Sequence, residues 1–192
     1  MCFFLISIIY FCNNHKRLTL IENNFILAIE SSCDDTAAAV LNNREVLSNC
    51  IYNQNTLHIP YGGIVPELAS RAHQSKITPI VNQALHEANI DKKDLNAIAY
   101  TQGPGLLGSL LVGSSFAKSM SLALKIPIIP IHHMHGHLLA HFIENNNYES
   151  PKFPFIGITL SGGHTQILYV KDYFDMKIIG NTLDDAIGEA FD

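Results

Sequence analysis

From Phe25 onward the chain alternates short apolar runs with polar turns. Residues 25–29 and 37–41 are apolar, and the polar stretch 30–36 separates them. Short apolar runs bounded by turn residues predict buried strands. The alternating pattern of residues 45–52 predicts another strand behind a turn at 42–44. The chain is therefore expected to open with strand, turn, strand, turn, strand.

A long helix is expected after the glycines Gly62 and Gly63. Pro66 and Glu67 stand where a helix typically begins, and apolar residues follow at helical spacing. These apolar positions are Ile77, Ile80, Val81, Ala84, Leu85 and Ala88. Pro79 lies inside the pattern, so a break or kink is predicted there.

Another helix is predicted for the apolar segment 106–124, which follows a predicted strand at 97–101 and a turn at 102–105. Its many small residues suit a helix packed closely on a sheet. The segment is also long enough to raise the question of a membrane span. Its serines and Lys118 favour a buried core helix instead.

The opening pattern returns after the polar segment 144–152, which is a candidate domain boundary. Residues 155–160 and 166–170 are apolar runs on either side of the small polar turn 161–165. Strands that alternate with helices indicate an α/β fold, and the repeat indicates duplicated halves. Halves of this kind place two phosphate-binding loops face to face across a cleft.

The composition is that of a globular protein without overall attraction for nucleic acid. Of its 192 residues, 47% are hydrophobic and 15% are charged, and the net charge is −5. The chain is long enough to bury a sizeable core, whereas RNA binding would need a local basic patch or a partner. The cysteines Cys2, Cys12, Cys33 and Cys50 have no CxxC spacing, which argues against a zinc ribbon and fits a reducing compartment.

The first residues form a separate apolar run. Residues 1–12 are too few to span a bilayer, and the basic residues Lys16 and Arg17 follow the run, whereas a secretory signal has them in front. We interpret residues 1–24 as an apolar extension outside the globular fold, and we predict a cytoplasmic protein without stable membrane association. The alternatives are a membrane anchor through this run and a mitochondrial location.

The segment 131–141 is dense in histidine. It holds five of the ten histidines, and His133 and His137 are four residues apart. On a helix this spacing places both imidazoles on one face, close enough to share a metal ion. His137 and His141 repeat the spacing. Because neutral imidazole suits zinc or iron, we predict a metal site here rather than a solvated helix face.

Two loops carry candidate chemistry. The turn at Ser161, Gly162 and Gly163 has no bulky side chain, so its backbone N–H groups can approach phosphate oxygens closely. In the opposite loop, Asp34 and Asp35 could act through a metal or as proton acceptors. The alternatives are an ordinary glycine turn and a turn made by Asx side chains.

Five motifs together resemble the TsaD family, the tRNA adenosine threonylcarbamoyltransferases formerly described as glycoproteases. They are ESSCDDT (30–36), GGIVPELASR (62–71), GPGL (103–106), HHMHGH (132–137) and SGGHTQ (161–166). Their order and spacing match over residues 25–192. The resemblance implies an actin-like ATPase (ASKHA) fold of duplicated domains. Residues 25–150 would form the first domain, and residues 151–192 would begin a second, truncated one.

The resemblance also assigns site residues by position. His133 and His137 match a pair that binds one divalent metal ion, Fe²⁺ or Zn²⁺. An acidic residue that binds the ribose corresponds to Asp192. The loop that would hold threonylcarbamoyl-adenylate or an ATP-type nucleotide comprises Thr159, Leu160, Ser161, Gly162 and Gly163.

Asp34 matches an acidic residue that is needed for transfer, and Asp35 stands where the family usually has the longer Glu. The implied reaction moves the threonylcarbamoyl group from threonylcarbamoyl-adenylate to N6 of the tRNA adenosine at position 37. Because the chain has few Lys and Arg residues, tRNA capture implies partner subunits. The resemblance implies that a TsaB-like paralogue is one of them.

Family members continue well beyond the position of Asp192. We therefore expect this chain alone to be inactive or severely impaired, with an underfilled metal site and an uncovered apolar face on its second domain. One alternative function is a truncated, non-catalytic paralogue that acts as a partner subunit. A metalloendopeptidase is the other, and the absence of a Glu between His133 and His137 argues against it.

Overall fold

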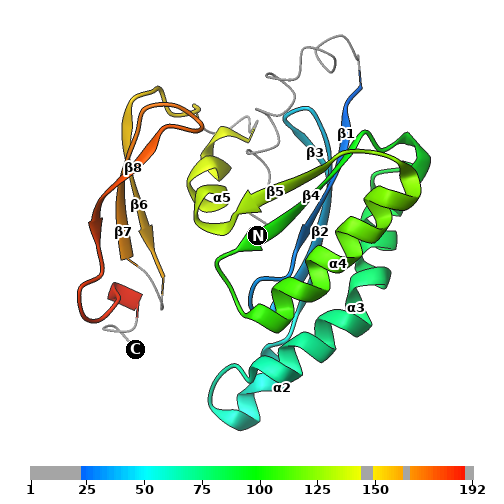
Figure 1. Cartoon of the computed structure of the whole chain (residues 1–192), viewed down its shortest axis with the longest axis horizontal. Coiled ribbons are helices and arrows are strands. Elements are labelled where there is room, and N and C mark those ends of the chain that lie inside the picture. The colour runs from blue at the N-terminus through cyan, green and yellow to red at the C-terminus, as the bar shows by residue number, and fades with distance from the viewer. Residues whose placement is uncertain (1–22, 144–148, 162–164, 189–192) are drawn as a thin grey trace.

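The computed structural model describes residues 23–143, 149–161 and 165–188 (Figure 1). The predicted extension 1–24 and the predicted boundary 144–152 therefore lie largely outside the described residues.

A five-stranded sheet forms the larger part of the structure. Its strands are β1 (Phe25–Glu30), β2 (Asp35–Asn42), β3 (Glu45–Asn53), β4 (Ala97–Gly103) and β5 (Ile128–His132), in the order β3-β2-β1-β4-β5. The first three strands are antiparallel, whereas β4 and β5 run parallel to β1. The three strands predicted at the start of the chain are thus confirmed, and so is the α/β fold class.

Two long helices, α3 (Pro66–Glu87) and α4 (Leu107–Leu124), cover one face of this sheet (Figure 1). Alternate residues of β1 face opposite sides, as strand geometry requires. Leu27 and Ile29 belong to the core under these helices, whereas Ile26 and Ala28 belong to the core on the other face. Shorter elements complete this part: α2 (Asn55–His58), α5 (His133–Leu139) and the 3-10 turns Ile59–Tyr61, Lys92–Asp94 and Ala140–Phe142.

The prediction of a break at Pro79 is wrong, because α3 runs through it without interruption. Proline removes the hydrogen bond to the carbonyl four residues earlier, that of Ser75. Both Pro79 and Ser75 are exposed, so water can bind the freed carbonyl. Ile77 and Ile80 are buried on the opposite side and hold the helix on the sheet.

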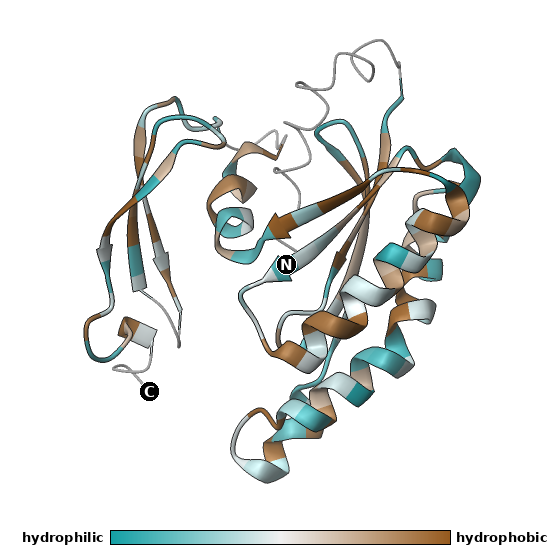
Figure 2. Ribbon diagram, viewed as in Figure 1, coloured by the Kyte–Doolittle hydropathy of each residue, from teal (hydrophilic) through white to brown (hydrophobic). Residues whose placement is uncertain are grey.

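The prediction of a buried helix for α4 is correct only for one face. Ser109, Gly113 and Ala117 are buried against the rest of the domain, but Leu111 and Leu122 are 55% and 81% exposed. Apolar residues therefore appear along the outer side of α4 (Figure 2). Within the described part of the chain, α4 is the one helix long and apolar enough to cross a membrane, a property that core helices of soluble proteins share.

A second, three-stranded sheet follows. Its strands β6 (Phe155–Leu160), β7 (Thr165–Val170) and β8 (Met176–Asn181) are antiparallel in the order β6-β7-β8, so they repeat the arrangement of β1 to β3. The pattern predicted β6 and β7 but not β8. Ile156, Ile158 and Leu160 are exposed on β6, which confirms the expected uncovered apolar face.

Aromatic rings join the second sheet to the turn that follows α5. Phe142 stacks on Phe153 with ring centroids 5.0 Å apart, and Tyr173 packs edge-on against Phe153 at 4.8 Å. Leu138 of α5 packs with Leu168 of β7 in a small buried cluster. These contacts place α5 between the two sheets (Figure 1).

Candidate functional site

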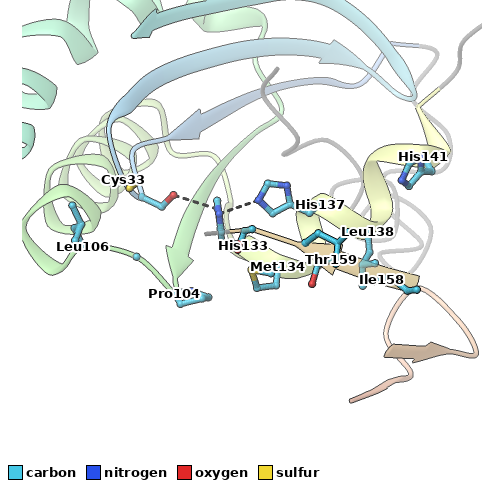
Figure 3. Close-up of a pocket in the computed structure, with 14 residues that line it drawn as sticks. Cys33, Pro104, Leu106, His133, Met134, His137, Leu138, His141, Ile158 and Thr159 are labelled. Atoms are coloured by element: carbon cyan, nitrogen blue, oxygen red, sulfur yellow. Dashed lines mark hydrogen bonds between the residues drawn. The ribbon is translucent and has the colours of Figure 1, made fainter. Parts of the chain in front are cut away.

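A cavity of about 750 Å³ lies where α5 faces the ends of β1 and β6 (Figure 3). The turn after β1 contributes Ser32 and Cys33, and the end of β6 contributes Thr159, Leu160 and Ser161. The turn after β1 and the end of β6 thus line one cavity. Residues 162–164 of the second loop lie outside the described residues, so the facing of the two loops stays a prediction.

His133 and His137 lie one turn apart on α5 and both line the cavity (Figure 3). Their Nε2 atoms are 3.0 Å apart, and the rings meet edge to face with centroids 4.5 Å apart. Two imidazole ligands at about 2.1 Å from a tetrahedral ion have nitrogens roughly 3.4 Å apart. The pair therefore fits a divalent metal ion after a small adjustment.

The predicted metal site would have two protein ligands in the histidine pair. Among the described residues no group of three or more His, Cys, Asp or Glu side chains could hold a metal. His141 lies four residues after His137, a spacing that also suggested a shared metal ion. It lines the cavity from the 3-10 turn after α5. The metal site and its incomplete ligand set therefore stay predictions.

Electrostatics favour neutral imidazoles here. Burial lowers the pKa of His137, and the neighbouring His133 lowers it further, with Glu30 opposing both effects. Burial also lowers the pKa of His132 and His135, whose rings pack together at 4.4 Å. Since only a neutral imidazole can bind a metal, the lowered pKa of His137 suits a metal site.

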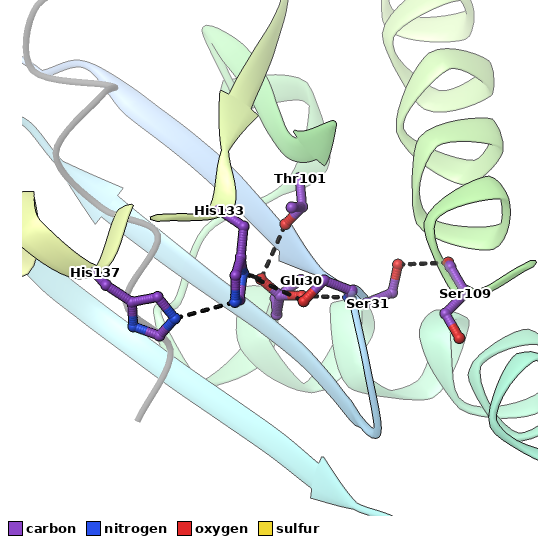
Figure 4. A network of polar contacts seen from close by, with 7 residues as sticks. Glu30, Ser31, Thr101, Ser109, His133 and His137 are labelled. Carbon is purple, nitrogen blue, oxygen red and sulfur yellow. Dashed lines mark hydrogen bonds and ion pairs between the residues drawn. The ribbon is translucent and has the colours of Figure 1, made fainter. Parts of the chain in front are cut away.

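A buried carboxylate, Glu30, lies behind the histidine pair (Figure 4). Its Oε2 accepts a hydrogen bond of 2.9 Å from Thr101 Oγ1 and lies 3.4 Å from Nδ1 of His133. Its Oε1 accepts a hydrogen bond from the backbone N–H of Ser32. Sequence reasoning missed this role, although a Glu directly after a buried strand, at the start of the ESSCDDT motif, was a signal for it.

Thr159 carries an unpaired buried oxygen in this cavity. The residue is 7% exposed, and its Oγ1 has no hydrogen-bond partner among the described residues. A buried hydroxyl without a partner is unfavourable by about 1–3 kcal/mol, so a bound ligand that satisfies it would gain affinity. The predicted loop residues Gly162 and Gly163, and the predicted ribose ligand Asp192, lie outside the described residues.

The structure separates the carboxylates of Asp34 and Asp35 from the histidine pair. Asp34 lines a smaller cavity of about 450 Å³ together with Gly62 and Gly63. Asp35 accepts a hydrogen bond of 2.7 Å from Asn53. Burial raises the pKa of Asp35, and the adjacent Asp34 raises it further.

Residues of both long helices hold the loop that contains Ser32, Cys33 and Asp34 in place. His73 of α3 is fully buried, and its Nε2 lies 3.0 Å from the carbonyl oxygen of Cys33. Its Nδ1 is 2.7 Å from Thr36 Oγ1. At the start of α4 the N–H of Leu106 donates to the carbonyl of Ser32 at 2.7 Å. No sequence pattern pointed to these contacts.

Comparison with known proteins gives consistent results. Residues 45–192 match the family described as TsaD: tRNA N6-adenosine threonylcarbamoyltransferase. Proteins of that name from Christiangramia forsetii and Riemerella anatipestifer are 66% and 58% identical over 167 and 171 residues, which are 87% and 89% of this chain. The same matches cover 49% and 50% of those proteins, so the chain spans about half the length of the curated relatives it matches.

Among solved structures, YeaZ from Pseudomonas aeruginosa is similar with a TM-score of 0.54 and 17% identity, over 83% of this chain and 66% of that one. This likeness concerns the fold, and it agrees with the predicted actin-like ATPase fold.

Proposed function

The chain belongs to the TsaD family of tRNA N6-adenosine threonylcarbamoyltransferases, and from that premise we propose that it takes part in threonylcarbamoyl transfer to tRNA. The donor is threonylcarbamoyl-adenylate, and the acceptor is N6 of the adenosine at position 37. The observation that carries the proposal is the shared cavity, which the histidine pair of α5 lines together with the turn after β1 and the end of β6.

His133 and His137 would hold one divalent ion, Fe²⁺ or Zn²⁺, through their Nε2 atoms. When bound, the ion supplies Lewis-acid polarisation of carbamoyl and phosphate oxygens. Thr159, Leu160 and Ser161 would bind the adenylate, with the unpaired Oγ1 of Thr159 as one donor. Gly162, Gly163 and Asp192 remain proposed members of this nucleotide site by their position in the family.

The transfer forms one bond and breaks another. The N6 amine attacks the carbamoyl carbon, and the bond between that carbon and the phosphate oxygen breaks, which releases AMP. The amine gives up a proton, and Asp34 or Asp35 is the proposed acceptor. This role rests on their position in the family, because Asp34 lines the smaller cavity beside Gly62 and Gly63, and Asp35 is hydrogen-bonded to Asn53.

A chimera tests this proposal directly. The chain replaces the matching half of the Christiangramia forsetii relative, and the product nucleoside is quantified by mass spectrometry after incubation with threonylcarbamoyl-adenylate, tRNA and the partner subunit. We expect product from the chimera and at least a hundredfold slower formation with His133→Ala or Asp34→Asn. His86→Ala, which changes an exposed histidine of α3, is the matched control. A folded chimera without product would refute the proposal.

We further propose that a YeaZ-like subunit binds the outer side of α3 and α4. Leu107, Leu111 and Leu122 are exposed there, and a groove between the helices is lined by Ile77 and Phe116 among others. Exposed apolar patches of this kind are typical of protein interfaces. A subunit with the same fold would present an equivalent pair of helices.

The partner proposal is tested by binding. We expect Leu111→Glu and Leu122→Glu to weaken association with the YeaZ-like subunit at least tenfold in calorimetry. Leu183→Glu, at a fully exposed leucine after β8, should leave it unchanged. Equal affinities for all variants would place the partner elsewhere. The free thiols of Cys33 and Cys50 support the further proposal that this complex is cytoplasmic.

A further inference from the structure

Glu30 is a buried acid with a fixed orientation. Its residue is 9% exposed, and its two oxygens accept hydrogen bonds from the N–H of Ser32 and the hydroxyl of Thr101 (Figure 4). A buried carboxylate is unfavourable unless donors surround it. Its Oε2 also lies 3.4 Å from Nδ1 of His133.

The surroundings of His133 determine which ring nitrogen carries the proton. Its Nδ1 faces the carboxylate of Glu30 and lies 3.3 Å from Ser32 Oγ. A carboxylate can only accept, so a proton on Nδ1 is favoured. The Nε2 atom then keeps its lone pair, and it faces Nε2 of His137 inside the cavity.

We propose that Glu30 is a positioning residue that holds His133 with its proton on Nδ1 and its Nε2 lone pair aimed at the metal position. The proposal rests on the proposed function in taking His133 as a metal ligand. Thr101 acts indirectly, because its hydroxyl donates a hydrogen bond that orients the carboxylate of Glu30.

The same carboxylate also connects the metal ligand to the loop after β1. Glu30 holds the backbone of Ser32, and Ser32 precedes Cys33 at the cavity wall. Polar groups behind a metal-binding histidine fix its ring and raise its basicity, and their removal typically lowers metal affinity by about 10- to 100-fold. An effect of this size is expected for Glu30.

The test uses Glu30→Gln, which keeps the shape and removes the charge. Long-range ¹H–¹⁵N NMR spectra of the metal-free protein at a pH where the ring is neutral should show wild-type His133 protonated on Nδ1. We expect the variant to shift toward the form protonated on Nε2. Its Zn²⁺ affinity, measured against a chromogenic chelator, should fall by about 10- to 100-fold. Glu45→Gln, at an exposed glutamate in β3, is the matched control.

A folded Glu30→Gln protein with the wild-type tautomer and a Zn²⁺ affinity within twofold of wild type would overturn the proposal. If this variant does not fold, Thr101→Val provides the test, because it removes only the hydroxyl that orients Glu30. We expect it to shift the tautomer in the same direction and to lower Zn²⁺ affinity less; no change in either would overturn the proposal.

A purely structural role of Glu30 would lower the melting temperature and leave the tautomer unaltered. Neither readout depends on tRNA modification. If the proposed transferase function fails, the tautomer of His133 and the Zn²⁺ affinity still test the role of Glu30.

Discussion

Leu138 of α5 lies directly over Gly157 of β6. A Cβ atom on Gly157 would come within 2.5 Å of Leu138 Cδ2, so only glycine permits the observed approach. Leu138 also lines the cavity that holds the histidine pair. This contact therefore sets how closely the second sheet approaches α5.

Gly157→Ala should force Leu138 to move within a packed cluster. Leu138 is buried with Leu168 and Val170, so it has little room to rotate. Overpacking of this kind lowers the free energy of unfolding by about 1–3 kcal/mol, which urea denaturation would measure. Gly63→Ala is the control, because a Cβ there meets no heavy atom within 4 Å. Equal effects of the two substitutions would contradict the close packing.

Pro79→Ala should stabilise the chain. The substitution restores the N–H that can bond the carbonyl of Ser75 within an uninterrupted helix. Inside a helix, proline lowers stability by about 3 kcal/mol relative to alanine. Proline also restricts the unfolded chain, which offsets roughly 0.4–1 kcal/mol of that loss. A net gain of about 2–2.6 kcal/mol in thermal or urea unfolding is expected. Pro66→Ala, at the first turn, should give no such gain.

The sequence predicted most strands and both long helices because each carries a clear period or an apolar run. It did not predict β8, whose exposed residues Ile178 and Ile179 show no alternation of buried and exposed positions. His133 and His137 could be predicted from their spacing alone. The position of Glu30 after a buried strand was a signal for a buried carboxylate, but its contacts with Thr101 of β4 and His133 of α5 could not be predicted, since these residues lie far away in the chain.

His73 should make the stability depend on pH. Burial lowers its pKa in the folded state, although Cys33 accepts its hydrogen bond and Glu30, Asp34 and Asp35 act in the opposite direction. The unfolded chain then takes up a proton first, so the free energy of unfolding decreases as pH falls below about 6.5. Urea unfolding at pH 7.5 and 5.5 measures this loss.

The variant His73→Gln isolates the contribution of this residue, because the other histidines with lowered pKa remain in place. It should be less stable at pH 7.5 by about 1–3 kcal/mol, through loss of buried hydrogen bonds. Its stability should also change less between the two pH values. An unchanged difference would show that His73 does not titrate on unfolding.

Cys33 should react slowly despite its exposure. Burial of the sulfur, followed by the negative charge of Asp34, raises the pKa of this thiol to about 11 from 9.0. Since the thiolate is the nucleophile, alkylation by iodoacetamide at pH 8 should be about a hundredfold slower than for an unperturbed thiol. Peptide mapping by mass spectrometry follows the rate, and Asp34→Asn should increase it. Fast alkylation of Cys33 in the folded protein would contradict this environment.

The most direct test is the metal content of the chain at equilibrium. After dialysis against micromolar Zn²⁺ or Fe²⁺, we expect about one ion per chain, bound weakly because His133 and His137 supply only part of a ligand set. His133→Ala and His137→Ala should each lose that ion, whereas His86→Ala should retain it. If both histidine variants keep the metal content of the unaltered chain, the assignment of this cavity as a metal site is wrong.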